Sequence, residues 1–264
     1  MTQVSEPRWT LVVGGSRGLG AACARHIAQG GQPVVVTYRL DLRAAKAVEH
    51  DIRAAGAPWS RVAEMELNDP KQCESRIESL MDDLGPPGAV VLSAAQLLQA
   101  SLRDTPVDDF AAQLTCNCTS PYAIARTCGL AMRAAGSGSI TMLSSVIGPF
   151  GVHDRVAYAT SKAGLIGMTK ALAVELAPQV RVNAVVLGTF ATDITARLQE
   201  DRPALRALES RVPLGRLGTA DEAAVVVALL AQQAHFVTGA VWEVDGGTSA
   251  RLATPSGDPD LGRD

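Results

Sequence analysis

Short, continuously apolar runs alternate with helical patterns along most of the chain, and this alternation constrains the fold more than any other feature. Four runs lack the in–out alternation of a half-exposed strand: residues 9–15 (WTLVVGG), 33–38 (PVVVTY), 88–94 (GAVVLSA) and 180–188 (VRVNAVVLG). Strands buried on both faces have this composition, and they occur in parallel sheets with helices on both sides. We therefore predict an α/β fold with a doubly wound parallel sheet of the Rossmann type.

Further strands, and the helices between strands, complete the pattern. Strands are predicted at residues 60–67, 138–145 and 240–247, and helices at 20–31, 41–56, 69–85, 106–135, 156–177 and 219–233. No linker-like composition interrupts residues 1–250, so we predict a single domain there. Residues 251–264 are rich in Pro, Gly and Asp, and we predict an extended or disordered tail.

The composition argues against several classes of partner. A net charge of -3 leaves no basic excess, so no nucleic-acid partner is expected. The N-terminus has no basic start followed by an apolar run, and no apolar stretch has the length of a membrane span. The five cysteines are scattered, and the pair Cys116 and Cys118 has no further ligands at zinc spacing, so no metal site is expected. Reduced thiols in a cytoplasmic protein account for them.

A glycine-rich loop, VVGGSRGLG (12–20), follows the first predicted strand and opens the first helix. Gly14, Gly18 and Gly20 suit a tight turn, a close approach to a pyrophosphate, and close packing of helix on strand. Glycines also mark ordinary strand-to-helix turns, so the loop alone decides little. Its position in the first strand–loop–helix unit favours a dinucleotide site.

The end of the second strand indicates which dinucleotide is bound. An NAD site usually has an acidic residue there that holds the ribose 2′-hydroxyl. This chain has Arg39 just after the strand and Arg17 in the glycine loop, and two guanidiniums suit a 2′-phosphate. Asp41 is an alternative partner for Arg39. We predict NADP(H) as the cofactor.

Tyr158 and Lys162 are four residues apart in a predicted helix, so they share a face. A lysine cation beside a phenol stabilises the phenolate and lowers the tyrosine pKa toward neutrality, which would make Tyr158 a usable proton donor. The alternative is a buried tyrosine beside a lysine whose stem packs on the protein while its amine reaches water. His153, in the preceding loop, either lines a pocket or lies on the surface.

Several spaced motifs together resemble the short-chain dehydrogenase/reductase family, especially its 3-oxoacyl-acyl-carrier-protein reductases. VGGSRGLG is similar to the family's TGxxxGxG, and YATSK (158–162) matches YxxxK. Ser145 stands 13 residues before Tyr158, at the family's spacing. Asn117 matches the fourth residue of the family tetrad, and VRVNAVVLGTFATDI is similar to VNAVxPGxxxTxM. The likeness spans about Thr10 to Thr248.

The resemblance implies an NADPH-dependent ketoreductase acting on a 3-oxoacyl thioester, carried by a carrier protein or coenzyme A. It implies that Tyr158 donates the proton, Lys162 tunes it and binds the nicotinamide ribose, Ser145 orients the substrate oxygen, and Asn117 holds a water. The implied cofactor contacts are Gly14, Ser16, Arg17, Gly18, Leu19, Gly20, Arg39, Leu67, Ala94, Tyr158, Lys162, Gly188 and Thr192. A reductase of another ketone, or a dehydrogenase of another secondary alcohol, is the main alternative. A dinucleotide-binding sensor without activity is the less favoured one.

Assembly and docking are also implied. The helix carrying Tyr158 is apolar nearly all round, which predicts a subunit interface, and the resemblance implies a tetramer or dimer. Arg126 and Arg133 are candidates for a basic patch near the entrance that would meet an acidic carrier protein.

The chain departs from the family pattern at three points near the cofactor. Residues 92–95 read LSAA where NNAG is usual, which removes asparagine amides that help to fix the backbone. Leu187 replaces a proline, and Val13 replaces a threonine. None of these changes touches the proton-donating residues.

Overall fold

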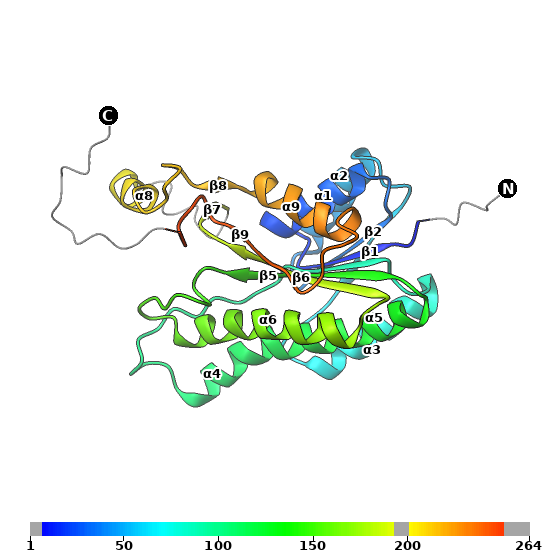
Figure 1. Cartoon of the computed structure of the whole chain (residues 1–264), viewed down its shortest axis with the longest axis horizontal. Coiled ribbons are helices and arrows are strands. Elements are labelled where there is room, and N and C mark those ends of the chain that lie inside the picture. The colour runs from blue at the N-terminus through cyan, green and yellow to red at the C-terminus, as the bar shows by residue number, and fades with distance from the viewer. Residues whose placement is uncertain (1–6, 193–200, 251–264) are drawn as a thin grey trace.

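A seven-stranded parallel sheet forms the centre of the computed structural model, which describes residues 7–192 and 201–250 (Figure 1). The strand order is β3-β2-β1-β4-β5-β6-β9, and every neighbouring pair is parallel. The strands are β1 (Thr10–Val13), β2 (Val34–Tyr38), β3 (Ser60–Glu64), β4 (Ala89–Leu92), β5 (Gly138–Ser145), β6 (Val180–Leu187) and β9 (Val241–Val244). The predicted doubly wound parallel sheet is therefore confirmed.

Helices cover both faces of this sheet. In Figure 1, α1, α2 and α9 lie on one side, and α3, α4, α5 and α6 lie on the other. The helices are α1 (Gly18–Gln29), α2 (Leu42–Ala54), α3 (Pro70–Leu84), α4 (Val107–Leu114), α5 (Ser120–Ala134), α6 (Val156–Glu175), α8 (Arg202–Glu209) and α9 (Ala220–Gln232). A second, two-stranded sheet joins β7 (Phe190–Ala191) to β8 (Gly218–Thr219).

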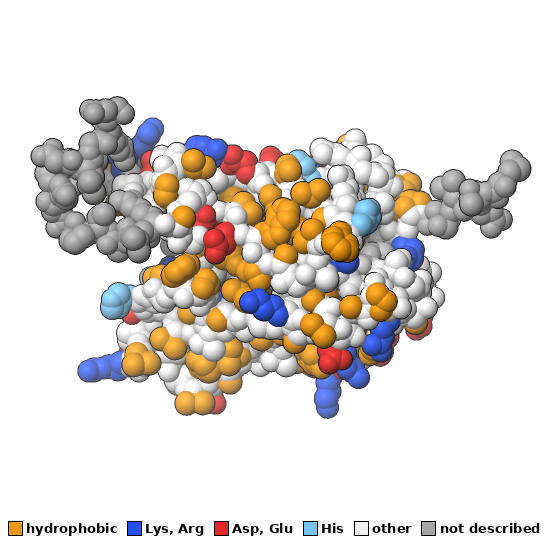
Figure 2. Space-filling model, in the orientation of Figure 1, with side chains coloured by type: hydrophobic (Ala, Val, Ile, Leu, Met, Phe, Trp, Pro, Cys, Tyr) orange, Lys and Arg blue, Asp and Glu red, His pale blue; other side chains and the backbone are white. Residues whose placement is uncertain are grey.

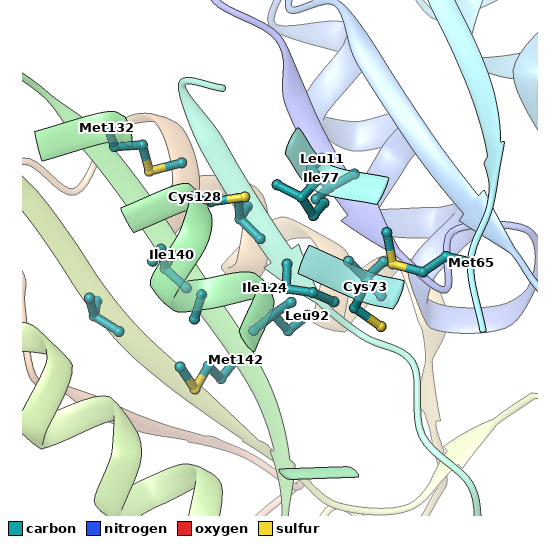
Figure 3. Packing of buried hydrophobic residues seen from close by; sticks show 14 of the residues in the cluster. Leu11, Met65, Cys73, Ile77, Leu92, Ile124, Cys128, Met132, Ile140 and Met142 are labelled. Carbon is teal, nitrogen blue, oxygen red and sulfur yellow. The ribbon is translucent and has the colours of Figure 1, made fainter. Parts of the chain in front are cut away.

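Each face of the sheet has its own apolar core. One cluster joins the central strands to α3 and α5, with Leu11, Ile77, Ile124 and Ile140 at its centre (Figure 3). The other cluster packs α1 and α9 against the opposite face. Strands β1 and β4 are buried at every position, as their continuous apolar sequences predict.

The predicted helix at 106–135 is interrupted. Residues Thr115–Thr119 form a π-helical turn, η1, between α4 and α5. A π-turn inserts one extra residue into a helix and is frequent at functional sites. The short helix α8 was not predicted: Leu205 and Leu208 stand at helical spacing, but the element has only eight residues, and all its side chains are at least partly exposed.

The order of the strands determines where a ligand can bind. From β1 the chain proceeds outward to β2 and β3, then returns past β1 to β4, β5 and β6. The direction reverses between β1 and β4, and a crevice forms at the carboxyl ends of the strands beside such a reversal. The predicted tail at 251–264, and Asp193 and Ile194 of the motif after β6, lie outside the described residues.

Within residues 7–192 and 201–250, no helix combines the length and apolar character needed to cross a membrane.

Candidate active site

A cleft of about 510 Å³ opens at the carboxyl ends of β1 to β4, beside the reversal of strand order. Ten of the thirteen predicted cofactor contacts line it: Gly14, Ser16, Arg17, Gly18, Leu19, Gly20, Arg39, Leu67, Ala94 and Thr192. Tyr158, Lys162 and Gly188 do not line the cleft. Gly188 has a different reason to be glycine, because a Cβ there would lie 2.6 Å from the Cα of Asp245 in the chain after β9.

The glycine loop has the backbone geometry that its residues suggest. Gly14 has φ +76°, and its N–H donates a 2.9 Å hydrogen bond to the Thr37 hydroxyl on β2. A Cβ on Gly14 would come within 2.6 Å of Ala94, and one on Gly20 would collide with the carbonyl oxygen of Gly14. The loop therefore folds tightly beneath the N-terminus of α1, where backbone amides and the helix dipole favour an anion.

Arg17 and Arg39 both line the cleft, and the ion pair that the sequence offered as an alternative, Asp41 with Arg39, does not form. Asp41 pairs with Arg17 at 3.4 Å rather than with Arg39, and both partners are largely exposed. The other oxygen of Asp41 accepts from the Ala44 N–H at 2.9 Å and so caps α2. Arg39 is exposed and lines the same cleft. Both guanidiniums can therefore reach a phosphate there.

Strand β5 and helix α6 bring the catalytic candidates together. Ser145 is the last residue of β5, and its hydroxyl lies near enough to the phenol of Tyr158 on α6 to influence the pKa of that phenol. The Nζ atom of Lys162 lies 5.6 Å from the centroid of the Tyr158 ring. Lys162 is 3% exposed, and its ammonium donates a 2.8 Å hydrogen bond to the Leu143 carbonyl of β5.

The electrostatics of Tyr158 differ from the sequence-based expectation. Burial raises the pKa of the phenol, while the Ser145 hydroxyl and the charge of Arg155 act in the opposite direction. Lys162 was expected to lower this pKa, and the net direction is upward because desolvation of the phenolate outweighs the favourable contacts. Tyr158 therefore remains protonated at neutral pH, which suits a proton donor.

The pKa of Lys162 is shifted as well. Burial lowers the pKa of its ammonium to about 8, and the nearby thiols of Cys116 and Cys118 act weakly in the other direction. A buried amine with so low a pKa changes its charge close to neutrality. Such a group, beside a tyrosine and a cleft, is typical of a functional site.

Asn117 lies in the π-turn η1, and its side chain is held at both ends. Its Oδ1 accepts from the Gln96 N–H at 2.8 Å, and its Nδ2 donates to the Gln96 carbonyl at 2.8 Å and to the Ser161 hydroxyl at 3.2 Å. Ser161 in turn donates to the Tyr158 carbonyl at 2.7 Å. Asn117 thus links the cleft to the helix that carries Tyr158.

The cleft also has lining residues that the sequence did not suggest. Glu66, Gln96 and Cys116 come from three separate segments that only the tertiary fold brings together. Tyr38 ends β2, and Leu40 lies directly after Arg39, so the argument that found Arg39 and Asp41 could also have found Tyr38 and Leu40. His153 is exposed and does not line the cleft, which favours its interpretation as a surface residue.

Comparison with known proteins identifies the family. A sequence profile described as enoyl-(acyl carrier protein) reductase matches residues 13–249, nearly the whole described chain. The chain belongs to the short-chain dehydrogenase/reductase family of oxidoreductases. Among curated members, the 3-oxoacyl-[acyl-carrier-protein] reductase FabG of Aquifex aeolicus is 34% identical over 247 residues, covering 90% of this chain and 96% of that protein. FabG of Escherichia coli is 32% identical over 244 residues, covering 92% and 97%.

Solved structures of other short-chain dehydrogenase/reductase proteins share the fold. A protein from Beutenbergia cavernae, described as an NAD(P)-dependent gluconate 5-dehydrogenase with bound NADP at low occupancy, superposes with a TM-score of 0.86 at 30% identity. It covers 92% of this chain and 97% of its own. A protein from Sinorhizobium meliloti, described as a short-chain alcohol dehydrogenase, has a TM-score of 0.87 at 29% identity, with coverages of 93% and 97%.

Proposed function

We propose that the protein is an NADPH-dependent ketoreductase that reduces a 3-oxoacyl thioester to the 3-hydroxyacyl product. The observation that carries this proposal is the Ser145–Tyr158–Lys162 group, with Ser145 and Lys162 buried and Tyr158 half-buried, beside a dinucleotide-sized cleft. The relatives named 3-oxoacyl-[acyl-carrier-protein] reductase support the substrate class, because they align with about nine-tenths of the chain.

The cleft fits a dinucleotide with a 2′-phosphate. Its glycine turn is so tight that a Cβ at Gly14 or Gly20 would collide with neighbouring protein atoms, and the turn leads into the N-terminus of α1, whose backbone amides could bind a pyrophosphate. Arg17 and Arg39 would hold the 2′-phosphate, and Thr192 also lines the cleft. When bound, the reduced nicotinamide supplies the hydride for the ketone carbon.

The protein's own residues supply the proton and the orientation. Ser145 would donate a hydrogen bond to the ketone oxygen, and the Tyr158 O–H would transfer its proton to that oxygen as the carbon accepts the hydride. The phenolate left behind is stabilised by the nearby Lys162 ammonium until a proton returns from solvent. A positioned acid of this kind contributes a factor of about 10² to 10⁴ in rate.

The carrier of the acyl group is the least supported part of the proposal. Arg126 pairs with Glu74 at 3.3 Å, and Arg133 donates to the Glu175 carbonyl at the end of α6. Arg133 also precedes β5, so it lies at the amino ends of the strands, opposite the cleft. The expected basic patch is therefore not formed at the entrance. The relatives described as gluconate and alcohol dehydrogenases keep the reduction of a free ketone as the second candidate.

Turnover measurements test this proposal directly. NADPH consumption is followed with a panel of 3-oxoacyl thioesters and free ketones, for the wild type and for Tyr158→Phe. We expect thioesters to be reduced and the Phe variant to bind NADPH normally while losing turnover. Reduction of free ketones alone would replace the thioester assignment, and equal rates for both proteins would refute the role of Tyr158.

We also propose a homo-oligomer, a tetramer or dimer. The outward face of α6 is small and apolar, with Val156, Ala163, Ala171 and Val174 exposed. Figure 2 shows further hydrophobic side chains gathered over α9 and β9, where β9 forms one edge of the sheet. Light scattering of the wild type and of Val174→Glu tests the α6 contact. A monomeric wild type would refute it.

The five unpaired thiols suit a reducing compartment, and we propose the cytoplasm.

A further inference from the structure

Gln113 is the single buried residue of α4, and it is polar. Its side chain is 2% exposed, although α4 has apolar residues that remain on the surface, such as Val107. A glutamine is seldom buried without a hydrogen-bonding task. Its Nε2 donates a 2.8 Å hydrogen bond to the carbonyl of Gln96, in the loop that leaves the cleft.

The loop after β4 depends on such contacts. The N–H groups of Ser93 and Ala94 both donate to the Val13 carbonyl, at 3.1 and 3.0 Å. Beyond them the chain has no regular structure until α4 begins at Val107. Backbone outside helices and sheets lacks the regular hydrogen-bond ladder, so side chains that bond to it help to hold its conformation.

Two amide side chains hold this loop at one peptide group. The carbonyl of Gln96 accepts from Gln113 and from Asn117, each at 2.8 Å, and the N–H of Gln96 donates to Asn117. Gln96 and the two alanines before it line the cleft. The amide clamp formed by Gln113 and Asn117 therefore fixes the wall against which a dinucleotide would lie.

We propose that Gln113 is a positioning residue for the cofactor: it holds the 94–96 wall of the cleft in the conformation that binds NADPH. This inference rests on the proposed function. It also accounts for the sequence LSAA at 92–95, since an amide on α4 takes over the anchoring that asparagines within that segment would provide.

The other end of the Gln113 amide argues against a purely stabilising role for the clamp. Its Oε1 is buried and has no hydrogen-bond partner among the described residues. A buried acceptor without a partner costs about as much as, or more than, the single bond that Nε2 gains. Folding alone would favour an apolar side chain of the same length at this position.

The experiment compares Gln113→Met with the wild type. Methionine keeps the length and removes the donor. The dissociation constant for NADPH is measured by fluorescence titration, which needs no acyl substrate, together with the melting temperature and kcat on the best substrate found. Val107→Gln, at an exposed position of the same helix, is the matched control.

We expect Gln113→Met to weaken NADPH binding about threefold to tenfold, the range for one lost hydrogen bond. Its melting temperature should stay within about 3 °C of the wild type, and kcat at saturating NADPH should be unchanged. Unaltered NADPH affinity would overturn the proposal, as would a fall in kcat alone, because the latter would mean that Gln113 acts through Asn117 on Tyr158. If the wild type binds NADPH but reduces no thioester, the proposed substrate fails while the role of Gln113 remains testable by titration.

Discussion

Replacing Lys162 by methionine is expected to separate stability from activity, because the fold holds this amine at a cost. The side chain is 3% exposed, and burial lowers the pKa of its ammonium from 10.5 to about 8. At 1.36 kcal/mol per pKa unit, this difference corresponds to about 3 kcal/mol of lost native-state stability.

The direction in which stability changes with pH follows from the number of protons bound by the folded and unfolded states. Between about pH 8 and pH 10.5 the unfolded chain keeps the proton on this lysine, whereas the folded protein has released it. Stability therefore rises with pH across that window, and the full cost is present below about pH 8. Methionine has a similar length and no charge, so it removes the cost at neutral pH.

One contact opposes this gain. The Lys162 ammonium donates a 2.8 Å hydrogen bond to the Leu143 carbonyl, and a bond from a charged donor contributes about 1.5–3 kcal/mol. The net change at pH 7 is therefore expected to be between about 0 and 2 kcal/mol toward greater stability. Turnover should fall by a factor of about 10² to 10⁴, because the phenolate loses its counter-charge.

Urea denaturation at pH 7 and at about pH 9.5 measures the change in the free energy of unfolding. Any stability that the variant gains over the wild type at pH 7 should shrink at the higher pH. NADPH consumption measures the expected loss of turnover. Lys71→Met, at an exposed position of α3 outside the proposed interface, is the control and should change neither. A variant destabilised by more than about 2 kcal/mol at pH 7, or one with wild-type turnover, would show that the reasoning is wrong.

Four further predictions concern the cleft, the helix caps and the pH profile. Gly20→Ala brings a Cβ against a backbone carbonyl of the glycine turn, so NADPH titration should show loss of binding. Arg39→Ser should reduce the preference for NADPH over NADH by about 10- to 100-fold in kcat/KM, the range for a charged hydrogen bond; an unchanged preference would exclude Arg39 from the phosphate site. Thr219→Ala removes the capping box of α9, so the melting temperature should fall by about 2–4 °C with unchanged turnover. The rate of ketone reduction should decline above about pH 8 as Lys162 loses its proton, and a flat profile to pH 10 would contradict this.

The sequence alone predicts the strands of the sheet because each strand is marked by a short apolar run of neighbouring residues. Continuous apolar runs correspond to strands such as β1 and β4, buried at every position, and the helices between them begin and end near the predicted residues. The π-turn η1 was not predictable in this way. One additional residue in a helix leaves the apolar pattern on both sides nearly unchanged, so residues 106–135 read as a single helix.

The residues of the candidate site also fall into two groups: those that a local motif predicts and those that only the tertiary fold brings together. Gly14, Gly20, Tyr158 and Lys162 lie in short motifs whose spacing carries the chemistry. Gln113 has no such motif, because its role depends on the position of Gln96, which only the tertiary fold provides. The direction of the Tyr158 pKa also needed the structure, since it depends on how completely the phenol is buried.

The distribution of rigid and irregular structure suggests which segments set the substrate. Ser145 ends β5, and Tyr158 and Lys162 lie in the first turns of α6; both elements pack along their length against the sheet core. Two loops adjoin these elements: 93–106, whose residues 93–96 line the cleft, and 146–155, which joins β5 to α6. These loops touch where Arg155 donates to Gln99 at 2.9 Å and the Ala100 N–H donates to the Asp154 carbonyl at 3.0 Å.

A fold of this kind can change its substrate without changing its chemistry, because the proposed catalytic groups lie on rigid elements and the adjoining segments are loops. This accounts for relatives with similar folds and different named substrates. Arg155→Gln with Gln99→Ala, which opens the contact between the loops, should therefore raise KM for the acyl substrate more than it lowers kcat. Steady-state kinetics at saturating NADPH measure both. A loss confined to kcat would mean that Arg155 acts on Tyr158 itself, as its charge near the phenol allows.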